Sequence, residues 1–335
     1  GQVQRQPAIH RIGDLCITDL VVKDGIAAGA VGFSVTDGRP VSIAAKAVII
    51  ATGGLTRLYR RNSASANMGG DGYALALRAG AELIDMEFVQ FFPIGHLAPR
   101  LIGMDPIMWD PFRYKLGGRL LNAEGREFAD DYGTPEDGSY KITRDRATYA
   151  ILKEVEAGRG SPAGGAYLSF QHVPEAKLRA AFGPVIDRLA ANGIDLTRMP
   201  VEVAPIAHYH MGGIRVTPLF ETGIAQLFAA GEAVGGANGA NRLSGNAITE
   251  ALVFGRRAGA LAAERAAKTP TAAWDEAAAA PALALVAAGA PGPTPNPAAL
   301  IVALQALMAE RVGPFRTVAG LAAALAGIAE MRGTL

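Results

Sequence analysis

Hydrophobic and polar positions along the chain predict a mixed α/β protein. Residues 1–54 form extended stretches separated by turns at residues 23–25 and 37–38, and they end near the apolar run Val48–Ile50. Because this run has no alternating polar positions, it predicts a strand buried on both faces, as in a parallel sheet. Residues 227–230 form a second short apolar strand.

Several later stretches have apolar residues at helical spacing. The predicted helices cover residues 73–79, 146–157, 175–192 and 247–263. Near the C-terminus the pattern predicts two amphipathic helices, broken at Gly313 and Pro314. Residues 268–297 are rich in Ala, Pro and Gly, and they predict a weakly ordered linker.

A loop rich in Gly and Asn joins the strand at residues 227–230 to the helix that begins at residue 247. Glycines allow the backbone to come close to a flat or anionic ligand, and the helix start offers unpaired N–H groups. Arg242 lies in the middle of this loop, where an arginine can bind a carboxylate or phosphate. Gly-rich loops also occur as plain connections, so other stretches must decide between these roles.

Composition narrows the class of protein. The chain has 335 residues, of which 50% are hydrophobic, and a formal net charge of +1, which fits a soluble globular protein and gives no electrostatic signature for nucleic acid or an anionic membrane. A single cysteine, Cys16, excludes an intrachain disulfide framework and favours a reducing, cytoplasmic setting. No apolar run reaches the length of a membrane span, and the start carries no signal-peptide pattern.

Three stretches together carry a family resemblance. They are AVIIATGG at residues 47–54, VAPIAHYHMGGI at residues 203–214, and the strand, loop and helix of residues 227–259. In this order they resemble the flavoprotein subunits of the succinate dehydrogenase and fumarate reductase family, which includes L-aspartate oxidase. The resemblance covers about residues 47–332 and implies an FAD-dependent oxidoreductase.

The resemblance implies an α/β fold with an incomplete Rossmann-like FAD-binding domain. Residues 1–60 and 201–267 would form this domain, residues 61–200 an inserted α+β cap domain, and residues 268–335 a linker and a short helical C-terminal domain. In the family, a strand, a G-x-G-x-x-G loop and a helix precede the β-rich segment with which this chain opens. The chain has no such unit at its start. We therefore expect it to correspond to the C-terminal part of a family member.

The resemblance also implies which residues meet FAD. Glu232 matches the acid that binds the FAD ribose. Asp71 matches an Asp that helps to hold FAD, although it could instead cap the helix that follows. The backbone where the helix begins after residue 245 would reach the flavin ring. The expected cofactor-binding residues are Ala51, Thr52, Gly53, Gly54, Asp71, Glu232, Asn246, Ala247 and Ile248.

Catalytic positions are implied in the same way. His208 matches the family's substrate-binding His, and Arg242 could bind a substrate carboxylate with it. The family's proton-transferring Arg, in the motif T-E-x-x-R-G-E-G-G, corresponds to Arg113 if one residue is inserted and to Tyr114 if none is. Arg113 could instead form a salt bridge with Asp110.

The substrate pocket departs from the family at two positions. Phe92 stands where the family has a His that contacts a substrate carboxylate, and Ile94 stands where it has a Thr. His210 falls at a variable position of the same pocket. On a strand it would point the same way as His208, but no third ligand is apparent, so we expect no metal site. The expected substrate is a small carboxylate other than succinate or fumarate, such as a monocarboxylate or a molecule with an apolar end.

Several functions stay open at this point. The first is an FAD-dependent oxidoreductase that transfers a hydride between flavin and a carbon adjacent to a carboxylate. The alternative is a catalytically incomplete subunit that needs a partner chain to complete its FAD site, and amine oxidation like that of L-aspartate oxidase is a third. Because the C-terminus is helical, a candidate partner is an iron–sulfur electron-transfer subunit. Arg144 and Asp145 match an Arg-Asp pair of the family, which we interpret as structural.

Overall fold

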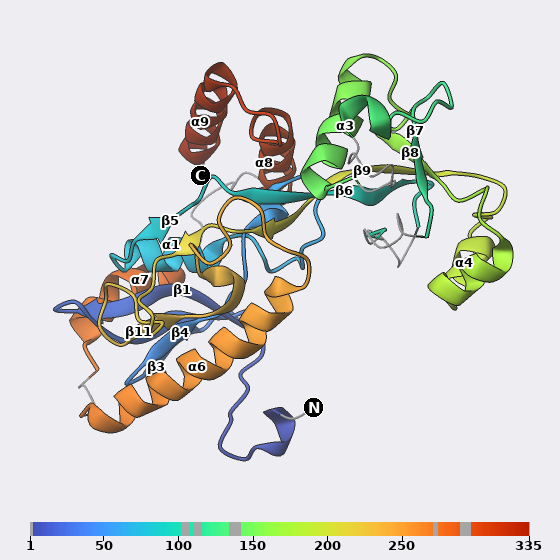
Figure 1. Ribbon diagram of the computed structural model, residues 1–335. Helices are drawn as coiled ribbons and strands as arrows, with labels where there is room; N and C mark the ends of the chain where they lie inside the picture. Colours follow the sequence, from blue (N-terminus) through green and yellow to red (C-terminus); the bar gives the residue numbers. More distant parts are fainter. Residues whose placement is uncertain are drawn as a thin grey trace. The chain divides into compact units, whose positions relative to one another are not determined.

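The computed structural model describes residues 3–101, 108–109, 116–133, 142–270, 274–288 and 296–334 (Figure 1). The chain forms two compact units, each assembled from three segments. The first unit comprises Gly1–Leu55, Met68–Phe88 and His210–Pro297, and the second comprises Thr56–Asn67, Val89–Tyr209 and Ala298–Leu335. Both units contain helices and strands, which confirms the predicted mixed α/β class.

In the first unit, a helix packs against a three-stranded antiparallel sheet. The strands β1 (Leu15–Lys23), β2 (Ile26–Ser34) and β3 (Pro40–Ala44) pair in this order. Ala279 of helix α7 (Glu276–Ala288) packs in a small cluster with strand residues Val21 and Val31. The weakly ordered linker predicted for residues 268–297 is wrong over α7. Its alanines favour a helix, and burial against the sheet outweighs the interruption at Pro281.

A short parallel pair of strands forms the other part of the first unit. Strand β4 (Val48–Ile50) pairs with β11 (Leu227–Ala229), so both strands predicted from apolar runs are confirmed. Tyr73 of helix α1 (Asp71–Arg78) packs with these strands in one hydrophobic cluster, and helix α6 (Asn246–Lys268) contacts both. The remaining elements are the pair β5 (Leu83–Ile84) and β10 (Gly213–Ile214) and the 3₁₀ helices η1 (Val3–Arg5) and η4 (Gly231–Ala233).

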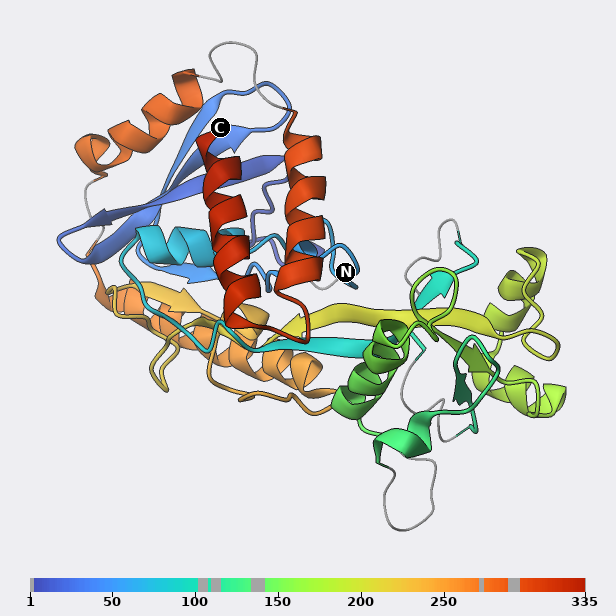
Figure 2. The same cartoon turned by 90° about the horizontal axis from the view of Figure 1, so that it is seen from above.

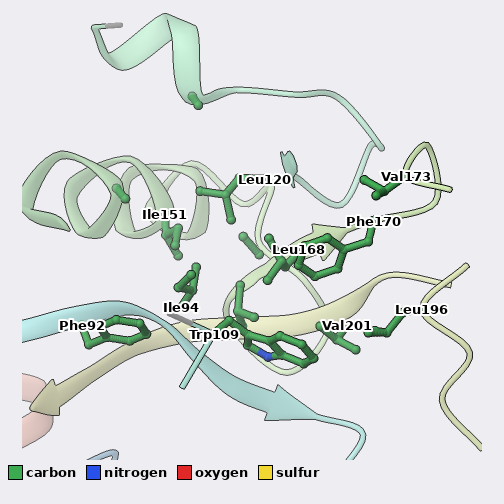
Figure 3. Close-up of a cluster of buried hydrophobic side chains, with 14 of the residues drawn as sticks. Phe92, Ile94, Trp109, Leu120, Ile151, Leu168, Phe170, Val173, Leu196 and Val201 are labelled. Carbon is green, nitrogen blue, oxygen red and sulfur yellow. The ribbon is translucent and has the colours of Figure 1, made fainter. Parts of the chain in front are cut away.

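The second unit contains a four-stranded sheet in the order β6-β9-β8-β7. Helix α3 (Arg144–Glu156) packs against β6, and its Ile151 joins the hydrophobic cluster shown in Figure 3. The strands of this sheet are β6 (Val89–Ala98), β7 (Arg119–Leu121), β8 (Ala166–Ser169) and β9 (Val201–His210). The 3₁₀ helices η2 (Thr56–Leu58) and η3 (Ala129–Tyr132) belong to the same unit.

Two helical predictions in the second unit need correction. The single helix predicted for residues 175–192 is two helices, α4 (Glu175–Phe182) and α5 (Val185–Ala191), because Gly183 leaves the helical conformation and Pro184 cannot continue the hydrogen-bond pattern. Helices α8 (Pro297–Arg311) and α9 (Val318–Gly333) lie side by side (Figure 2). They are not clearly amphipathic, since large apolar side chains such as Val302 and Val318 are exposed. Within the described ranges, no helix is both long and apolar enough to cross a membrane.

Candidate functional site

The carboxyl ends of the paired strands β4 and β11 meet in the first unit. Residues 51–54 follow β4, and Glu232 follows β11. The N–H of Ala230 donates a hydrogen bond to the carbonyl of Ile50 at 3.0 Å, which extends the pairing beyond the strands. A Cβ atom at Gly54 would overlap Oε1 of Glu232, so the carboxylate would have to move if this residue carried a side chain. Two segments that the sequence predicts to bind a cofactor are therefore direct neighbours.

The carboxylate of Glu232 lies in a partly buried, polar setting. Its Oε1 accepts a hydrogen bond from the backbone N–H of His210 at 3.0 Å. Burial raises the pKa of Glu232 to about 7. The bond from His210 and the charge of Arg242 lower the pKa by less, and Glu250 raises it further. This carboxyl group therefore changes its charge near neutral pH.

Tyr73 forms hydrogen bonds with the backbone at Glu232. Its hydroxyl lies 2.9 Å from the carbonyl oxygen of Glu232 and 3.2 Å from that of Gly212. The side chain is buried, and burial together with the negative charge of Glu232 raises the pKa of Tyr73 well above its ordinary value. Tyr73 therefore stays protonated and acts as a hydrogen-bond donor to these carbonyl groups.

Helix α1 begins close to the end of β4. A Cβ atom at Gly72 would overlap Oγ1 of Thr52, so the helix start packs directly on the Thr-Gly-Gly turn. The N-cap residue is Gly70, and Asp71 is the first helical residue with an exposed side chain. The alternative role of Asp71 as a helix cap is therefore wrong. Its carboxylate lies in the first turn, where the helix dipole favours negative charge.

The Gly-rich loop brings a buried arginine into the same unit. Arg242 is 5% exposed, and its Nη1 donates to the carbonyl of Leu243 at 3.2 Å. The positive charge of Arg242 lowers the pKa of Glu232 and so opposes part of the effect of burial. Further along the loop, Asn238 donates to Glu250 of helix α6 at 2.7 Å. The predicted residues 246–248 at the start of α6 are more open, and Ile248 is 69% exposed.

In the second unit, His208 lies among polar and aromatic side chains. Its Nδ1 is 2.9 Å from Oγ of Ser63, and its ring centroid is 5.7 Å from that of Phe92. The guanidinium of Arg144 lies 5.3 Å from the centroid of the same Phe92 ring. Arg144 Nη1 also donates to Oε1 of Gln90 at 3.3 Å. Phe92 therefore contacts both a cation and an imidazole.

Sequence reasoning missed Ser63, Gln90 and Arg144 as members of this cluster. The structural role of Arg144 and Asp145 stays a prediction, and the structure adds contacts of Arg144 with Gln90 and Phe92. A signal for Arg144 was present in the sequence. It is the first residue of α3, where the helix dipole disfavours a positive charge, so helix stability alone does not explain an arginine there.

Ile94 lies deeper than Phe92 in the hydrophobic cluster of the second unit (Figure 3). Its side chain is fully buried, and its carbonyl accepts a hydrogen bond from the N–H of Trp109 at 3.1 Å. The indole of Trp109 in turn packs edge-on against Phe182, with centroids 5.7 Å apart. The residue that replaces the family's Thr is thus part of a packed core.

His210 has its ring nitrogens directed at the backbone of the first unit. Nδ1 lies 2.8 Å from the carbonyl oxygen of Gly212, and Nε2 lies 3.2 Å from that of Met86. The ring is 1% exposed. The place of His210 in the substrate pocket stays a prediction.

The predicted catalytic residue Arg113 lies outside the described residues, as do its alternatives Tyr114 and Asp110.

In the described part of the chain, no group of three His, Cys, Asp or Glu side chains is arranged to hold a metal ion.

The first unit meets several requirements of FAD. A partly buried carboxylate, Glu232, can accept hydrogen bonds from ribose hydroxyl groups. The missing Cβ at Gly54 lets the Glu232 carboxylate lie directly against the turn that follows β4. The start of α6 is exposed, although the N–H groups of Asn246 and Ile248 already donate to the carbonyls of Leu243 and Gly245, at 3.3 and 3.1 Å.

Comparisons with known proteins show which family the chain belongs to. A model of the FAD binding domain family matches residues 2–248. The fumarate reductase (CoM/CoB) of Methanothermobacter marburgensis has a subunit that is 41% identical over 258 residues, which are 77% of this chain and 46% of that protein. L-aspartate oxidase of Nostoc sp. is 38% identical over 215 residues, which are 64% of this chain and 36% of that protein.

Among solved structures, a variant of FrdA from the quinol fumarate reductase of E. coli matches with a TM-score of 0.87 and 33% identity. The match covers 98% of this chain and 58% of the FrdA chain. The chain thus spans about half the length of the relatives that it matches.

Proposed function

Because the chain belongs to the FAD binding domain family, and within it to the flavoproteins of succinate dehydrogenase and fumarate reductase, we propose that it forms part of an oxidoreductase acting on a CH–CH bond next to a carboxylate. When bound, FAD supplies the hydride-transfer chemistry. The observation that carries the proposal is the junction of Gly54 and Glu232 at the carboxyl ends of β4 and β11, where α/β sheets bind their ligands.

Residues of the first unit would hold the cofactor. Glu232 would accept the ribose hydroxyl groups, Asp71 would add a second carboxylate, and the backbone of residues 51–54 and 246–248 would border the rings. A visible absorption spectrum of the purified chain, taken before and after acid precipitation, tests this assignment. We expect a flavin band that acid releases. A colourless chain that also fails to bind added FAD would contradict the proposal for this chain.

Arg242 of the first unit and His208 of the second stay our proposed ligands for carboxylate groups of the substrate. An arginine forms charge-assisted, bidentate hydrogen bonds with a carboxylate. The Ser63 hydroxyl lies 2.9 Å from Nδ1 of His208, and this contact orients the imidazole ring.

A second group must handle the proton, and two arginines are candidates. Arg113 is the candidate from the family motif, and Arg144 is the candidate from its contacts with Phe92 and Gln90. The ordinary pKa of an arginine lies far above neutral, so either one can serve only if neighbours hold it beside the reacting carbon. Substituting Arg144→Lys should reduce turnover while flavin binding stays unchanged. Unchanged turnover would assign the role to Arg113.

The apolar side chains at Phe92 and Ile94 favour a substrate other than succinate. Neither can donate a hydrogen bond to a second carboxylate, and Phe92 offers its ring instead. We expect slow succinate oxidation by the unmodified protein and faster oxidation after Phe92→His with Ile94→Thr. Because Ile94 is packed in the core, Phe92→His alone is the matched control for lost stability. Turnover of succinate by the unmodified protein at about 1–1000 per second, the usual enzymatic range, would contradict an apolar pocket end.

A second candidate function is a half-site that another polypeptide segment completes. Its support is the apolar surface of the first unit, where Ile49 is 40% exposed and Ile248 and Leu252 are each 69% exposed. Parallel strands are normally covered on both faces, so these side chains favour a further covering segment. We expect a colourless chain to gain flavin when it is co-expressed with a segment that carries a strand, a G-x-G-x-x-G loop and a helix. Tight FAD binding by the chain alone would contradict this candidate.

The enzyme of one relative has more than one subunit, which bears on the electron partner. The relative from Methanothermobacter marburgensis is named as one subunit of its enzyme, so that protein belongs to a complex with more than one subunit. We propose that the electron partner of this protein is an iron–sulfur subunit. Co-purification of a protein with iron–sulfur absorption tests it, and full turnover with a small electron carrier and no such protein would contradict it.

A further inference from the structure

The second unit contains a cavity that none of the roles above uses. Its volume is about 340 Å³, at the lower end of the range found for small-molecule sites. Side chains from residues 59–61, strands β6 and β9, and helices α3 and α8 line it. The cavity therefore lies where the connection after η2 meets the C-terminal helices.

Aromatic and aliphatic side chains form one wall of the cavity. Tyr59 is 2% exposed and meets Phe91 edge-to-face, with ring centroids 5.4 Å apart. Leu152 and Pro205 extend this apolar wall. Such a surface favours a ligand with an aromatic or aliphatic body, because burying it removes apolar area from water.

The lining of the cavity also carries positive charge. Arg60 and Arg61 both line it, and neither forms an ion pair with a carboxylate of the described residues. Among the described residues, the guanidinium of Arg61 donates to the backbone carbonyls of Ala163 at 3.2 Å and Gly164 at 3.3 Å. Burial, with a smaller effect from the charge of Arg60, lowers the pKa of Arg61.

The one acid of the lining does not neutralise these arginines. Glu310 forms its ion pair with Arg311, at 2.8 Å. The cavity therefore combines an apolar wall with two arginines whose charge the surrounding carboxylates leave uncompensated. An anion that entered it would gain charge-assisted hydrogen bonds in a partly dry environment.

We propose that this cavity binds a small organic anion, with an aromatic or aliphatic body against Tyr59 and Phe91 and an acidic group paired with Arg60 and Arg61. The site is distinct from the His208 cluster. Neighbouring residues of a strand point to opposite faces, so Phe91 in the cavity and Phe92 beside His208 lie on opposite faces of β6.

Hydrogen bonds to backbone carbonyl groups hold the walls of the cavity in place. The N–H of Arg60 donates to the carbonyl of Gln305 in α8 at 3.2 Å, and the Gln305 amide donates to the carbonyl of Arg57 at 2.9 Å. The Tyr59 hydroxyl donates to the carbonyl of Val312 at 3.2 Å. The site is thus preformed, which lowers the cost of binding.

Two dyes that differ in one acidic group test the proposal. 8-Anilinonaphthalene-1-sulfonate carries a sulfonate, and N-phenyl-1-naphthylamine is the same skeleton without it. Fluorescence titration of the chain should show one saturable site for the sulfonate, at least about tenfold tighter than for the neutral dye, since a charge-assisted hydrogen bond is worth about a tenfold change in affinity or more.

Matched variants locate the dye. Arg60→Ala should weaken binding of the sulfonate about tenfold, and Ala306→Met should weaken both dyes by filling the cavity. The controls are Arg57→Ala, in the preceding 3₁₀ helix η2, and Ala303→Met, in the same helix α8; neither residue is part of the cavity lining. Both controls should leave the affinity unchanged. Circular dichroism of each variant checks that the fold is intact, and Arg60→Lys, which keeps the charge, should recover part of the affinity.

Several outcomes would overturn the proposal. Equal affinity for the two dyes would exclude recognition of the anion. Sulfonate binding that neither Arg60→Ala nor Ala306→Met weakens would place the dye on another apolar surface, such as the exposed side chains of α8 and α9. The absence of any saturable site would exclude this class of ligand from the cavity.

Discussion

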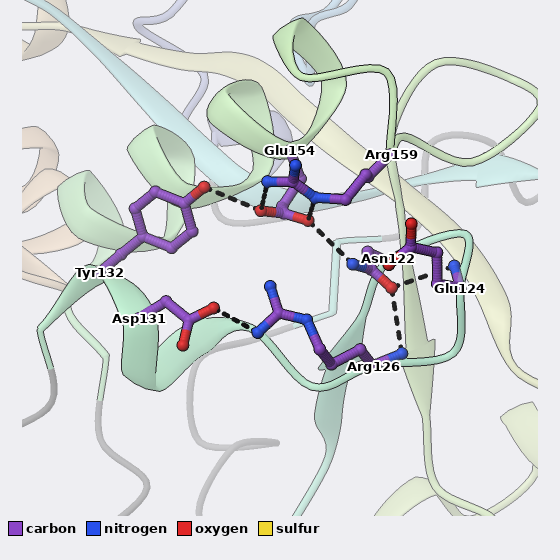
Figure 4. Close-up of polar contacts among 7 residues, drawn as sticks. All are labelled: Asn122, Glu124, Arg126, Asp131, Tyr132, Glu154 and Arg159. Carbon is purple, nitrogen blue, oxygen red and sulfur yellow. Dashed lines mark hydrogen bonds and ion pairs between the residues drawn. The ribbon is translucent and has the colours of Figure 1, made fainter.

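The carboxylate of Glu154 shows how a buried charge is held in the second unit. Its side chain is 1% exposed, and Arg159 donates to both of its oxygens, at 2.7 and 2.9 Å. Asn122 donates to it at 2.9 Å and the Tyr132 hydroxyl at 2.8 Å (Figure 4). These hydrogen bonds, that of Arg159 first, lower the pKa of Glu154 to about 2 despite burial.

Substituting Glu154→Gln should lower the free energy of unfolding by about 2–3 kcal/mol at pH 7, because Arg159 loses its anionic partner. A carboxyl group with a lowered pKa in the folded state stabilises the protein above its unfolded pKa near 4.5. That stabilisation is lost as the pH falls from there towards 2. Urea unfolding at several pH values should therefore show a shallower acid loss in the variant.

Glu156→Gln is the control for this experiment. Glu156 lies on the same helix, has a 55% exposed side chain and pairs with Lys153 at 2.7 Å. An exposed pair contributes at most about 1 kcal/mol. Equal losses from the two substitutions would show that the Glu154 network is not what stabilises this region.

Glu232 should give the opposite dependence on pH. Its pKa is raised to about 7 in the folded chain, so the folded state binds the proton more tightly than the unfolded state between about pH 4.5 and 7. Stability therefore falls as the pH rises through this window, by up to about 2–3 kcal/mol. Glu232→Gln should flatten this slope in denaturant unfolding of the flavin-free chain. Glu264→Gln, an exposed residue of α6, should leave the slope unchanged.

The sequence predicts part of the site at the level of residues. Gly54 and Glu232 follow apolar runs, so the topology of a parallel sheet brings them together, and the structure agrees. The cluster around His208 was only partly predictable. Ser63 and Arg144 are far from His208 in the chain, and no local pattern specifies their packing.

At the level of elements, the cap of helix α9 offers a direct test. The N-cap Thr317 accepts a hydrogen bond from the N–H of Gly320 at 3.0 Å. Thr317→Ala should destabilise α9 by about 1 kcal/mol, measured as faster hydrogen exchange in the first turn of that helix. Thr334→Ala removes a hydroxyl at the other end, where it donates to the Met331 carbonyl, and should change exchange less. An equal effect of both would contradict a capping role.

Elements with a strong apolar pattern were predictable, and those decided by tertiary packing were not. Strands β4 and β11 and helix α6 follow from runs and spacing in the sequence. Helix α7 depends on burial of Ala279 against Val21 and Val31, which lie about 250 residues away in the chain, so a local pattern rich in Ala, Pro and Gly suggested a linker instead.

At the level of the whole molecule, each unit has a separate hydrophobic core. Leu227 of β11 and Leu168 of β8 are both fully buried, the former in the first unit and the latter in the second. Substituting either by Ala should cost about 2–5 kcal/mol. Hydrogen exchange should rise mainly in the unit that carries the substitution. If either substitution raised the hydrogen-exchange rates equally in both units, the chain would unfold as a single cooperative unit.

Each unit contains one of the two tryptophans of the chain, so tryptophan fluorescence can follow the unfolding of each unit separately. Trp109 is 1% exposed in the core of the second unit, and Trp274 is partly buried beside α7 in the first. An indole shielded from water emits at a shorter wavelength than one that meets it. The emission of Trp274→Phe would therefore follow the melting of the second unit alone, and that of Trp109→Phe the melting of the first.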